Sequence, residues 1–113
     1  MRSTLHVLSR VRARPGMRDR LLPIMVGLLE PTRREQGCLR YDLMQSRTDP
    51  EAFVFIEEWE DEAALQSHLS EPDVQRAFRD VQPFVTEPPA LTRYQAVGPE
   101  SFEHAASIGP APH

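Results

Sequence analysis

The sequence predicts one α+β domain with a ferredoxin-like β-α-β-β-α-β order and an antiparallel four-stranded sheet. Residues 4–13 and 38–46 alternate with the two-residue period that is typical of strands, and residues 52–60 and 91–97 are also typical of strands. Between these segments the period changes to that of a helix, with apolar residues three and four positions apart. We expect strands at residues 4–13, 38–46, 52–60 and 91–97, and helices at 18–35, 61–69 and 73–81.

The composition limits the class of protein. The 113 residues fit one domain, and 40% hydrophobic residues are enough for a packed core. A formal net charge of -4, with no basic patch, argues against nucleic-acid binding. The single Cys38 excludes an internal disulfide, and no apolar run approaches the ~20 residues of a membrane helix. We therefore expect a cytoplasmic protein that binds neither nucleic acid nor membrane, with a domain at 1–97 and a flexible, proline-containing tail at 98–113.

Single residues predict where the helices begin and end. Pro23 is tolerable near the start of the first helix, whereas Pro31 should kink or break that helix near Glu30. Gly37 stands where a glycine just after a helix is expected. Asp61 is a credible N-cap for the next helix, because its carboxylate can accept hydrogen bonds from free backbone amides.

The strand expected at 52–60 is apolar on both faces. Phe55 and Trp59 share one face, and Val54 and Ile56 share the other, so the strand should be buried on both sides. Helices cover only one face of a ferredoxin-like sheet. The other face therefore needs a cover, and a second copy of the same chain is the commonest closed solution. We expect a homodimer formed through the sheet face.

Two strings of residues carry a family resemblance. Residues 31–41 (PTRREQGCLRY) and 53–60 (FVFIEEWE), followed by Ala64-Leu65 and His68-Leu69, closely resemble the antibiotic biosynthesis monooxygenase (ABM) family. The similarity in order and spacing extends from about residue 5 to about residue 97. It implies a dimeric α+β barrel with a pocket between helices and sheet in each subunit.

The resemblance also implies a reaction. Family enzymes oxidise phenolic, quinol or anthrone-like aromatic compounds with O2 and need no metal, flavin or haem cofactor. A deprotonated, electron-rich aromatic substrate can itself pass an electron to oxygen. The protein then supplies desolvation, orientation and a proton acceptor.

Two residues are the catalytic candidates. His68 lies beside the apolar stripe of the second helix, where a neutral imidazole could accept a phenol proton; a structural histidine is the alternative. Trp59 matches the strand tryptophan that lines the pocket of family oxygenases, and its indole N–H could donate to a substrate carbonyl. The alternative for this single tryptophan is a place in the core.

Five further residues are candidates for substrate binding. The set combines aromatic side chains with two charged groups: Tyr41, Phe55, Glu57, Phe78 and Arg79. Core packing is the alternative for Tyr41, a salt bridge for Glu57, and a solvated surface position for Arg79. Some family enzymes carry a polar Asn where Phe55 stands.

Two other functions fit the same fold. One is a non-catalytic dimer that binds a small ligand, which the apolar Phe55 favours modestly. The other is haem degradation by related proteins, which use an Asn on the first strand and a Trp and a His on later helices. Here the first strand has no Asn, and His68 and Phe78 occupy the other two positions.

Overall fold

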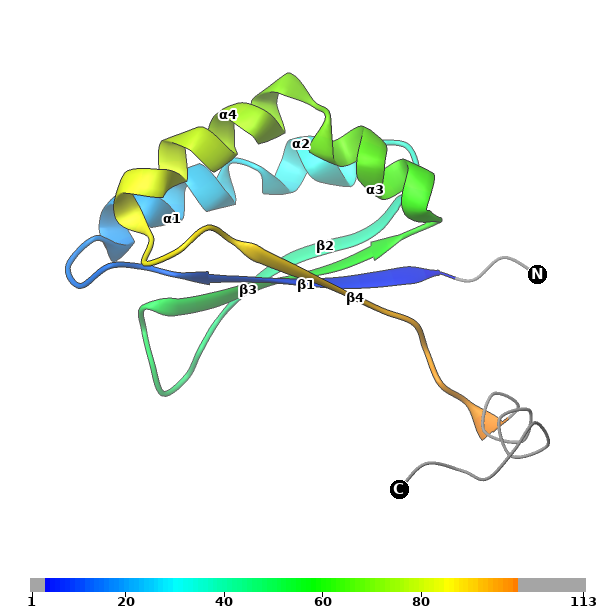
Figure 1. Cartoon of the computed structure of the whole chain (residues 1–113), viewed down its shortest axis with the longest axis horizontal. Coiled ribbons are helices and arrows are strands. Elements are labelled where there is room, and N and C mark those ends of the chain that lie inside the picture. Colours follow the sequence, from blue (N-terminus) through cyan, green and yellow to red (C-terminus); the bar gives the residue numbers. More distant parts are fainter. Residues whose placement is uncertain (1–3, 100–113) are drawn as a thin grey trace.

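The computed structural model describes residues 4–99 and shows a sheet with helices on one face (Figure 1). The strand order is β2-β3-β1-β4, and each neighbouring pair is antiparallel. The predicted ferredoxin-like fold is therefore confirmed. The tail expected from residue 98 lies almost entirely outside the described residues. The strands are β1 (Leu5–Arg12), β2 (Cys38–Gln45), β3 (Ala52–Trp59) and β4 (Ala90–Tyr94).

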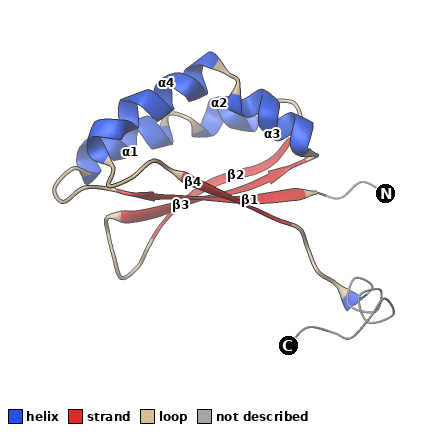
Figure 2. Cartoon of the chain, in the orientation of Figure 1, coloured by secondary structure: helices blue, strands red, loops and turns tan. Residues whose placement is uncertain are grey.

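All helices lie on the same side of the sheet, as Figure 2 shows by colour. They form the two connections that cross over the sheet, from β1 to β2 and from β3 to β4. No helix in the described range is long and apolar enough to span a membrane. The helices are α1 (Arg18–Val26), α2 (Leu29–Arg33), α3 (Glu62–Leu69) and α4 (Pro72–Val81), followed by the short 3₁₀ helix η1 (Gln82–Phe84).

The helix expected at 18–35 is divided into two, but its break lies at Gly27 and Leu28 rather than near Glu30. Pro31 has no N–H, so it cannot bond to the carbonyl four residues earlier, at Gly27. Because α2 starts at Leu29, Pro31 falls in a first turn, where amide donors have no helical partner in any case. The break therefore lies at Gly27 and Leu28, slightly before the predicted position near Glu30.

Gly37 is not a helix-ending glycine, because α2 already ends at Arg33. It has a positive φ of 84° in the turn before β2. A Cβ atom at this position would lie 2.6 Å from the Cβ of Ala64 on α3, closer than real Cβ atoms come. The glycine is thus required for backbone conformation and for contact between this turn and α3.

The start of α3 is as predicted. Oδ1 of Asp61 accepts a hydrogen bond of 2.9 Å from the backbone N–H of Ala64. Asp61 therefore caps the helix that presents His68, which lies in its last turn.

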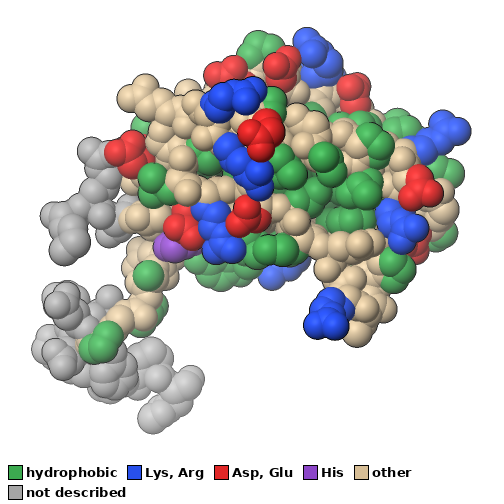
Figure 3. Space-filling view, turned by 180° about the vertical axis from the view of Figure 1, so that it is seen from behind, with side chains coloured by type: hydrophobic (Ala, Val, Ile, Leu, Met, Phe, Trp, Pro, Cys, Tyr) green, Lys and Arg blue, Asp and Glu red, His purple; other side chains and the backbone are tan. Residues whose placement is uncertain are grey.

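The two faces of β3 differ in burial. Phe55, Glu57 and Trp59 point to the helices and are at most 5% exposed, whereas Val54 and Ile56 on the opposite face are only partly buried. Within one chain, the expectation of burial on both sides is therefore met on the helix side alone. Figure 3 shows a band of mixed charges running from the helices to the sheet beside an apolar area.

Candidate functional site

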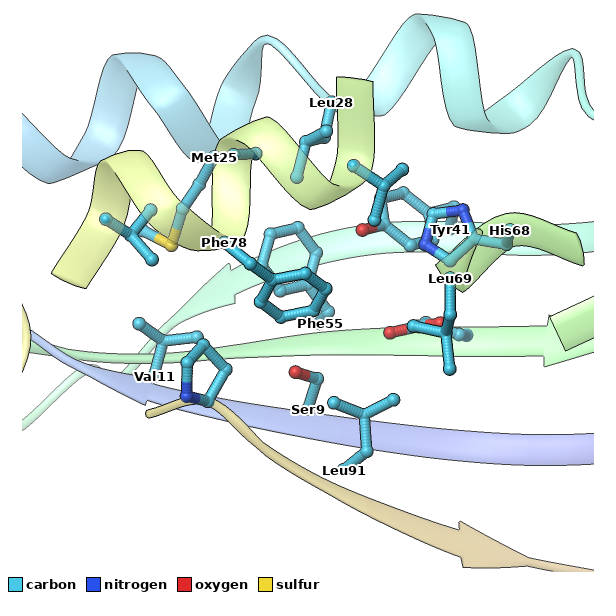
Figure 4. A pocket seen from close by; sticks show the side chains of 15 residues that line it. Ser9, Val11, Met25, Leu28, Tyr41, Phe55, His68, Leu69, Phe78 and Leu91 are labelled. Carbon is cyan, nitrogen blue, oxygen red and sulfur yellow. The ribbon is translucent and has the colours of Figure 1, made fainter. Parts of the chain in front are cut away.

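A small cavity lies between the helices and the sheet, and both crossover connections contribute to it. Its volume is about 40 Å³. Figure 4 shows Tyr41 and His68 close together in it, with Val11 and Met25 farther along. Four lining residues carry polar groups, and the others are apolar or aromatic. The polar ones are Ser9, Tyr41, Glu57 and His68, and the apolar ones include Val11, Met25, Leu28, Phe55, Phe78 and Leu91.

His68 is held by a carboxylate and by aromatic rings. Its side chain is 4% exposed, and its Nδ1 lies 2.9 Å and 3.1 Å from the two carboxylate oxygens of Glu35. The ring centroids of Trp59 and Tyr41 lie 4.8 Å and 5.5 Å from that of the imidazole. Burial lowers the pKa of His68 to about 4, so the imidazole is neutral near pH 7.

Glu35 follows α2, and its side chain is 19% exposed. Burial, with a smaller contribution from the charge of Glu71, raises the pKa of Glu35 to about 7. Near neutral pH this carboxyl group therefore exchanges a proton readily. When Glu35 is ionised, it accepts Nδ1–H of His68 and leaves the other ring nitrogen, Nε2, without a proton.

Glu57 is a second buried carboxyl group at the cavity, 3% exposed. Its Oε1 accepts a hydrogen bond of 2.9 Å from the indole Nε1–H of Trp59. Burial raises the pKa of Glu57 to about 7, although this hydrogen bond acts in the opposite direction. At or below pH 7 a large fraction of Glu57 is thus neutral and can donate a proton.

Trp59 stands behind the cavity rather than in its wall. It is completely buried, it is absent from the cavity lining, and its N–H is engaged by Glu57. Its indole ring packs against His68. In this geometry Trp59 contacts Glu57 and His68 and has no free N–H to donate to a substrate.

The candidates for substrate binding divide into two groups. Tyr41, Phe55, Glu57 and Phe78 line the cavity, whereas Arg79 is exposed on α4 and does not. Burial, with the nearby carboxylates second, raises the pKa of Tyr41 far above its usual value, so its hydroxyl keeps its proton. Tyr41 is therefore a hydrogen-bond donor here and not a base.

Sequence reasoning missed Glu35, the residue that contacts His68 most closely. The two are 33 positions apart, and no periodicity relates a turn after one helix to the last turn of another. One sequence feature could have indicated it: Glu35 lies two residues before Gly37, a glycine that allows its turn to approach the helix of His68. Ser9 and Leu28 were also missed, since each resembles an ordinary core position.

The site has the groups for proton transfer in an apolar setting. His68 supplies an acceptor, and Glu57 and Tyr41 supply donors. No arginine or lysine of the described chain lines the cavity. Among the described residues, no group of three or more His, Cys, Asp or Glu side chains could hold a metal ion.

The fold and this site define a small ferredoxin-like α+β protein with a small cavity that carries acid–base groups. The family model for antibiotic biosynthesis monooxygenases (ABM) matches residues 4–80. The chain therefore belongs to the antibiotic biosynthesis monooxygenase family, as the resemblance predicted.

Relatives of known sequence or structure agree with this assignment. The chain is 33% identical to Rv0793 of Mycobacterium tuberculosis over 92 residues, which is 81% of this chain and 90% of the relative. The solved structure of Rv0793 superposes with a TM-score of 0.79 and 29% identity, covering 85% of this chain and 97% of that one.

Two other relatives widen the comparison. A 4-hydroxy-5-phosphonooxypentane-2,3-dione isomerase of Yersinia enterocolitica is 32% identical over 72 residues, covering 64% of this chain and 70% of the isomerase. A Synechocystis protein, sll1783, is 29% identical over 66 residues, which is 58% of this chain. The match covers only 45% of the length of sll1783.

Proposed function

We propose that the protein is a cofactor-independent monooxygenase or oxidase that uses O2 on a phenolic, quinol or anthrone-like aromatic compound. One observation carries this proposal: a neutral histidine, His68, faces an apolar, aromatic-lined cavity. Such a base can accept a hydroxyl proton where little water competes. Family membership supports an oxidative reaction.

The reaction balances without an added cofactor. His68 accepts the substrate proton at Nε2, and the anion passes electrons to O2. An oxidase would convert quinol and O2 to quinone and hydrogen peroxide. A monooxygenase would convert a CH2 group, such as that of an anthrone, to C=O and release the other oxygen atom as water, so that the substrate supplies all four electrons and His68 returns the proton it accepted. Glu57, when neutral, can donate to a developing oxygen anion, and Trp59 positions that carboxyl group.

Substrate entry requires side chains to move. The cavity of about 40 Å³ is smaller than the ~150 Å³ that accommodates a benzene ring in a protein core. Leu28 between α1 and α2, Phe78 on α4 and Leu91 on β4 are the wall side chains that we expect to move. Haem is far larger still, so haem degradation is not proposed.

The test is oxygen consumption by metal-free protein with a panel of quinols and anthrones. His68→Gln should lower kcat by roughly 10²–10⁴-fold, the usual contribution of a positioned base. His6→Gln is the matched control, because His6 lies on β1 outside the cavity lining. A full rate in His68→Gln would remove the base from the mechanism, and tight binding without turnover would indicate a ligand-binding protein instead.

A second candidate is isomerisation by proton transfer. It is favoured by the two groups of opposite role that share the cavity, His68 as acceptor and Glu57 as donor, and one relative is named as an isomerase. A phosphorylated substrate does not suit a cavity whose described lining has no cation. Turnover of a hydroxyketone in the absence of oxygen would identify isomerisation, because the oxidative reaction cannot proceed without O2.

We infer that the protein forms a homodimer through the open face of the sheet. Leu8 and Ile56 are register partners in the middle of this face, and Val54 and Met44 are partners beside them. Ile56→Arg should convert the dimer to a monomer in light scattering, because it places an unpaired charge in the interface. Val26→Arg is the control, since Val26 is 49% exposed on α1. An unchanged mass in Ile56→Arg would exclude this interface.

A further inference from the structure

We propose that Glu35 is a positioning residue for His68: it keeps Nε2 as the basic nitrogen, takes the Nδ1 proton when Nε2 accepts one from the substrate, and exchanges protons with a groove at the surface. This inference rests on the proposed role of His68 as a base. It adds a residue outside the cavity wall and a second route, separate from the cavity mouth, by which the site exchanges protons with solvent.

The first step of the argument is the contact itself. Both oxygens of Glu35 lie within hydrogen-bond distance of Nδ1, at 2.9 Å and 3.1 Å. Nε2 has no hydrogen bond within the described part of the chain. An ionised Glu35 therefore selects the tautomer with hydrogen on Nδ1, and the lone pair of Nε2 is left for the substrate.

The second step is where Glu35 lies. It does not line the cavity but lines a separate groove between α1, α2 and α4, to which Glu71, Asp80 and Arg76 contribute. Leu28, Val74 and Ala77 line both spaces and so form the partition between them. Apolar side chains thus separate the two spaces, while the Glu35–His68 contact joins them. A proton can pass at this contact where a substrate cannot.

The third step is the direction of transfer. In a serine-protease triad the carboxylate stays ionised throughout, because it is a much weaker base than the histidine. Here burial reverses the order, since the pKa of Glu35 is raised to about 7 and that of His68 is lowered to about 4. A protonated His68 therefore gives its Nδ1 proton to Glu35. The starting tautomer is restored when Nε2 releases its hydrogen to the reduced oxygen and Glu35, which exchanges protons with water in the groove, returns a proton to Nδ1.

The groups around the pair support this order. Cys38 and Tyr41 on β2 and Glu57 on β3 interact electrostatically with Glu35, and Glu71 faces it from the start of α4. All of these groups are acidic, and none supplies a positive charge that would stabilise the Glu35 carboxylate. The groove also carries Asp73, Asp80 and Arg76, and the guanidinium of Arg76 is paired with Asp73 at 3.1 Å.

The test uses imidazole ¹⁵N NMR and the pH profile of turnover. In the native protein at pH 8, Nδ1 of His68 should carry the hydrogen, and the ¹⁵N shifts should follow the ionisation of Glu35 with a midpoint near pH 7. In Glu35→Gln the amide oxygen still accepts from Nδ1–H, so the tautomer should persist while this midpoint disappears. With substrate, kcat should fall tenfold or more and KM should change less than twofold. Glu30→Gln is the matched control at an exposed site on α2.

Glu71→Gln gives an independent check if Glu35→Gln does not fold. It removes the charge that raises the Glu35 pKa, so the midpoint in the ¹⁵N shifts should move to lower pH. Hydrogen on Nε2 of the native protein at pH 8, or an unchanged midpoint in Glu35→Gln, would overturn the proposal. These NMR results do not depend on turnover, so they stand even if the proposed oxidation fails.

Discussion

The indole Nε1–H of Trp59 donates to Oε1 of Glu57 over 2.9 Å, and both residues lie on the helix-facing side of β3. Two positions apart on one strand, their side chains point the same way. The hydrogen bond keeps a buried carboxyl group fixed at the cavity and uses the polar group of the tryptophan. Trp59 and Glu57 therefore form one unit in the site, with Glu57 as the member that reaches the cavity.

Replacement of Glu57 by Gln should stabilise the protein at alkaline pH. The folded-state pKa of Glu57 is raised from 4.5 to about 7, so the associated stability is present below pH 4.5 and lost as the pH rises through 7. Glu57→Gln keeps an oxygen acceptor for Trp59 and removes the buried charge. The free energy of unfolding at pH 8 should rise by about 1–3 kcal/mol, with little change at pH 5.

Urea unfolding at the two pH values, at one protein concentration, measures this effect. Glu30→Gln is the matched control, because Glu30 is exposed on α2, away from the cavity and the open sheet face, and pairs with Arg33 at 3.2 Å. Its effect should stay within about 0.5 kcal/mol. The pKa of Glu35 is also raised to about 7, so Glu35 contributes to stability with the same pH trend. The pKa of His68 is lowered to about 4, so its contribution to stability is lost as the pH falls from 6.5 towards 4. Equal effects of Glu57→Gln at both pH values would contradict burial as the cause.

Replacement of Trp59 by Phe should act on Glu57 as well as on packing. The variant removes the donor that lowers the pKa of Glu57, so this pKa should rise further. The lost indole volume and the unsatisfied carboxyl group should together cost about 2–4 kcal/mol of unfolding free energy. Carboxyl ¹³C titration and urea unfolding measure the two effects. A Glu57 pKa that stays unchanged would show that the hydrogen bond has no electrostatic consequence.

The two glycines with positive φ should respond differently to alanine. Gly16→Ala, with φ 79° and no atom within 4 Å of the new Cβ, should lose only about 1 kcal/mol for backbone strain. Gly37→Ala adds a contact of 2.6 Å with Ala64 and should lose about 2–4 kcal/mol. Comparison of the thermal unfolding of both variants separates the stability cost of backbone strain from that of the steric contact. Equal losses would mean that the turn and α3 can move apart freely.

Shortening Phe78 should enlarge the cavity. Phe78→Ala removes a ring from its wall, so a two-ring quinol should bind roughly tenfold more tightly relative to a one-ring quinol. Stability should fall by about 2 kcal/mol. Arg79→Ala is the adjacent control, since Arg79 is exposed and outside the lining, and both affinities should change less than twofold. A larger effect of Arg79 would restore its predicted role in substrate binding.

Sequence patterns predicted most elements closely: β1, β2, β3, α3 and α4 begin and end within one residue of the expected bounds, whereas β4 ends at Tyr94, three residues before the expected end at 97, and the helix expected at 18–35 is divided. Alternation locates β1 because the burial of one sheet face follows a strict two-residue period. The break between α1 and α2 was displaced because Pro31 affects the carbonyl four residues earlier, at Gly27. Periodicity describes which face is buried, and it does not describe which hydrogen bond is missing.

The sequence named several residues that share one cavity, but it did not predict the contacts between them. The family pattern and local spacing identified His68, Tyr41 and Phe55, and these do line one cavity. The partners of the polar groups could not be identified, since the Glu35–His68 contact depends on how two helix connections meet above the sheet. The contact between Trp59 and Glu57 could have been predicted, because residues two apart on a strand share a face.

The contact at Gly37 has a consequence for tolerance to mutation. Glu35 lies two residues before Gly37, and His68 lies one helical turn after Ala64, so the glycine and the alanine anchor the two ends of the same dyad. A single added methyl group would have to push these anchors apart, and the carboxylate and imidazole with them. The distance between Glu35 and His68 thus depends on the absence of a Cβ atom at Gly37.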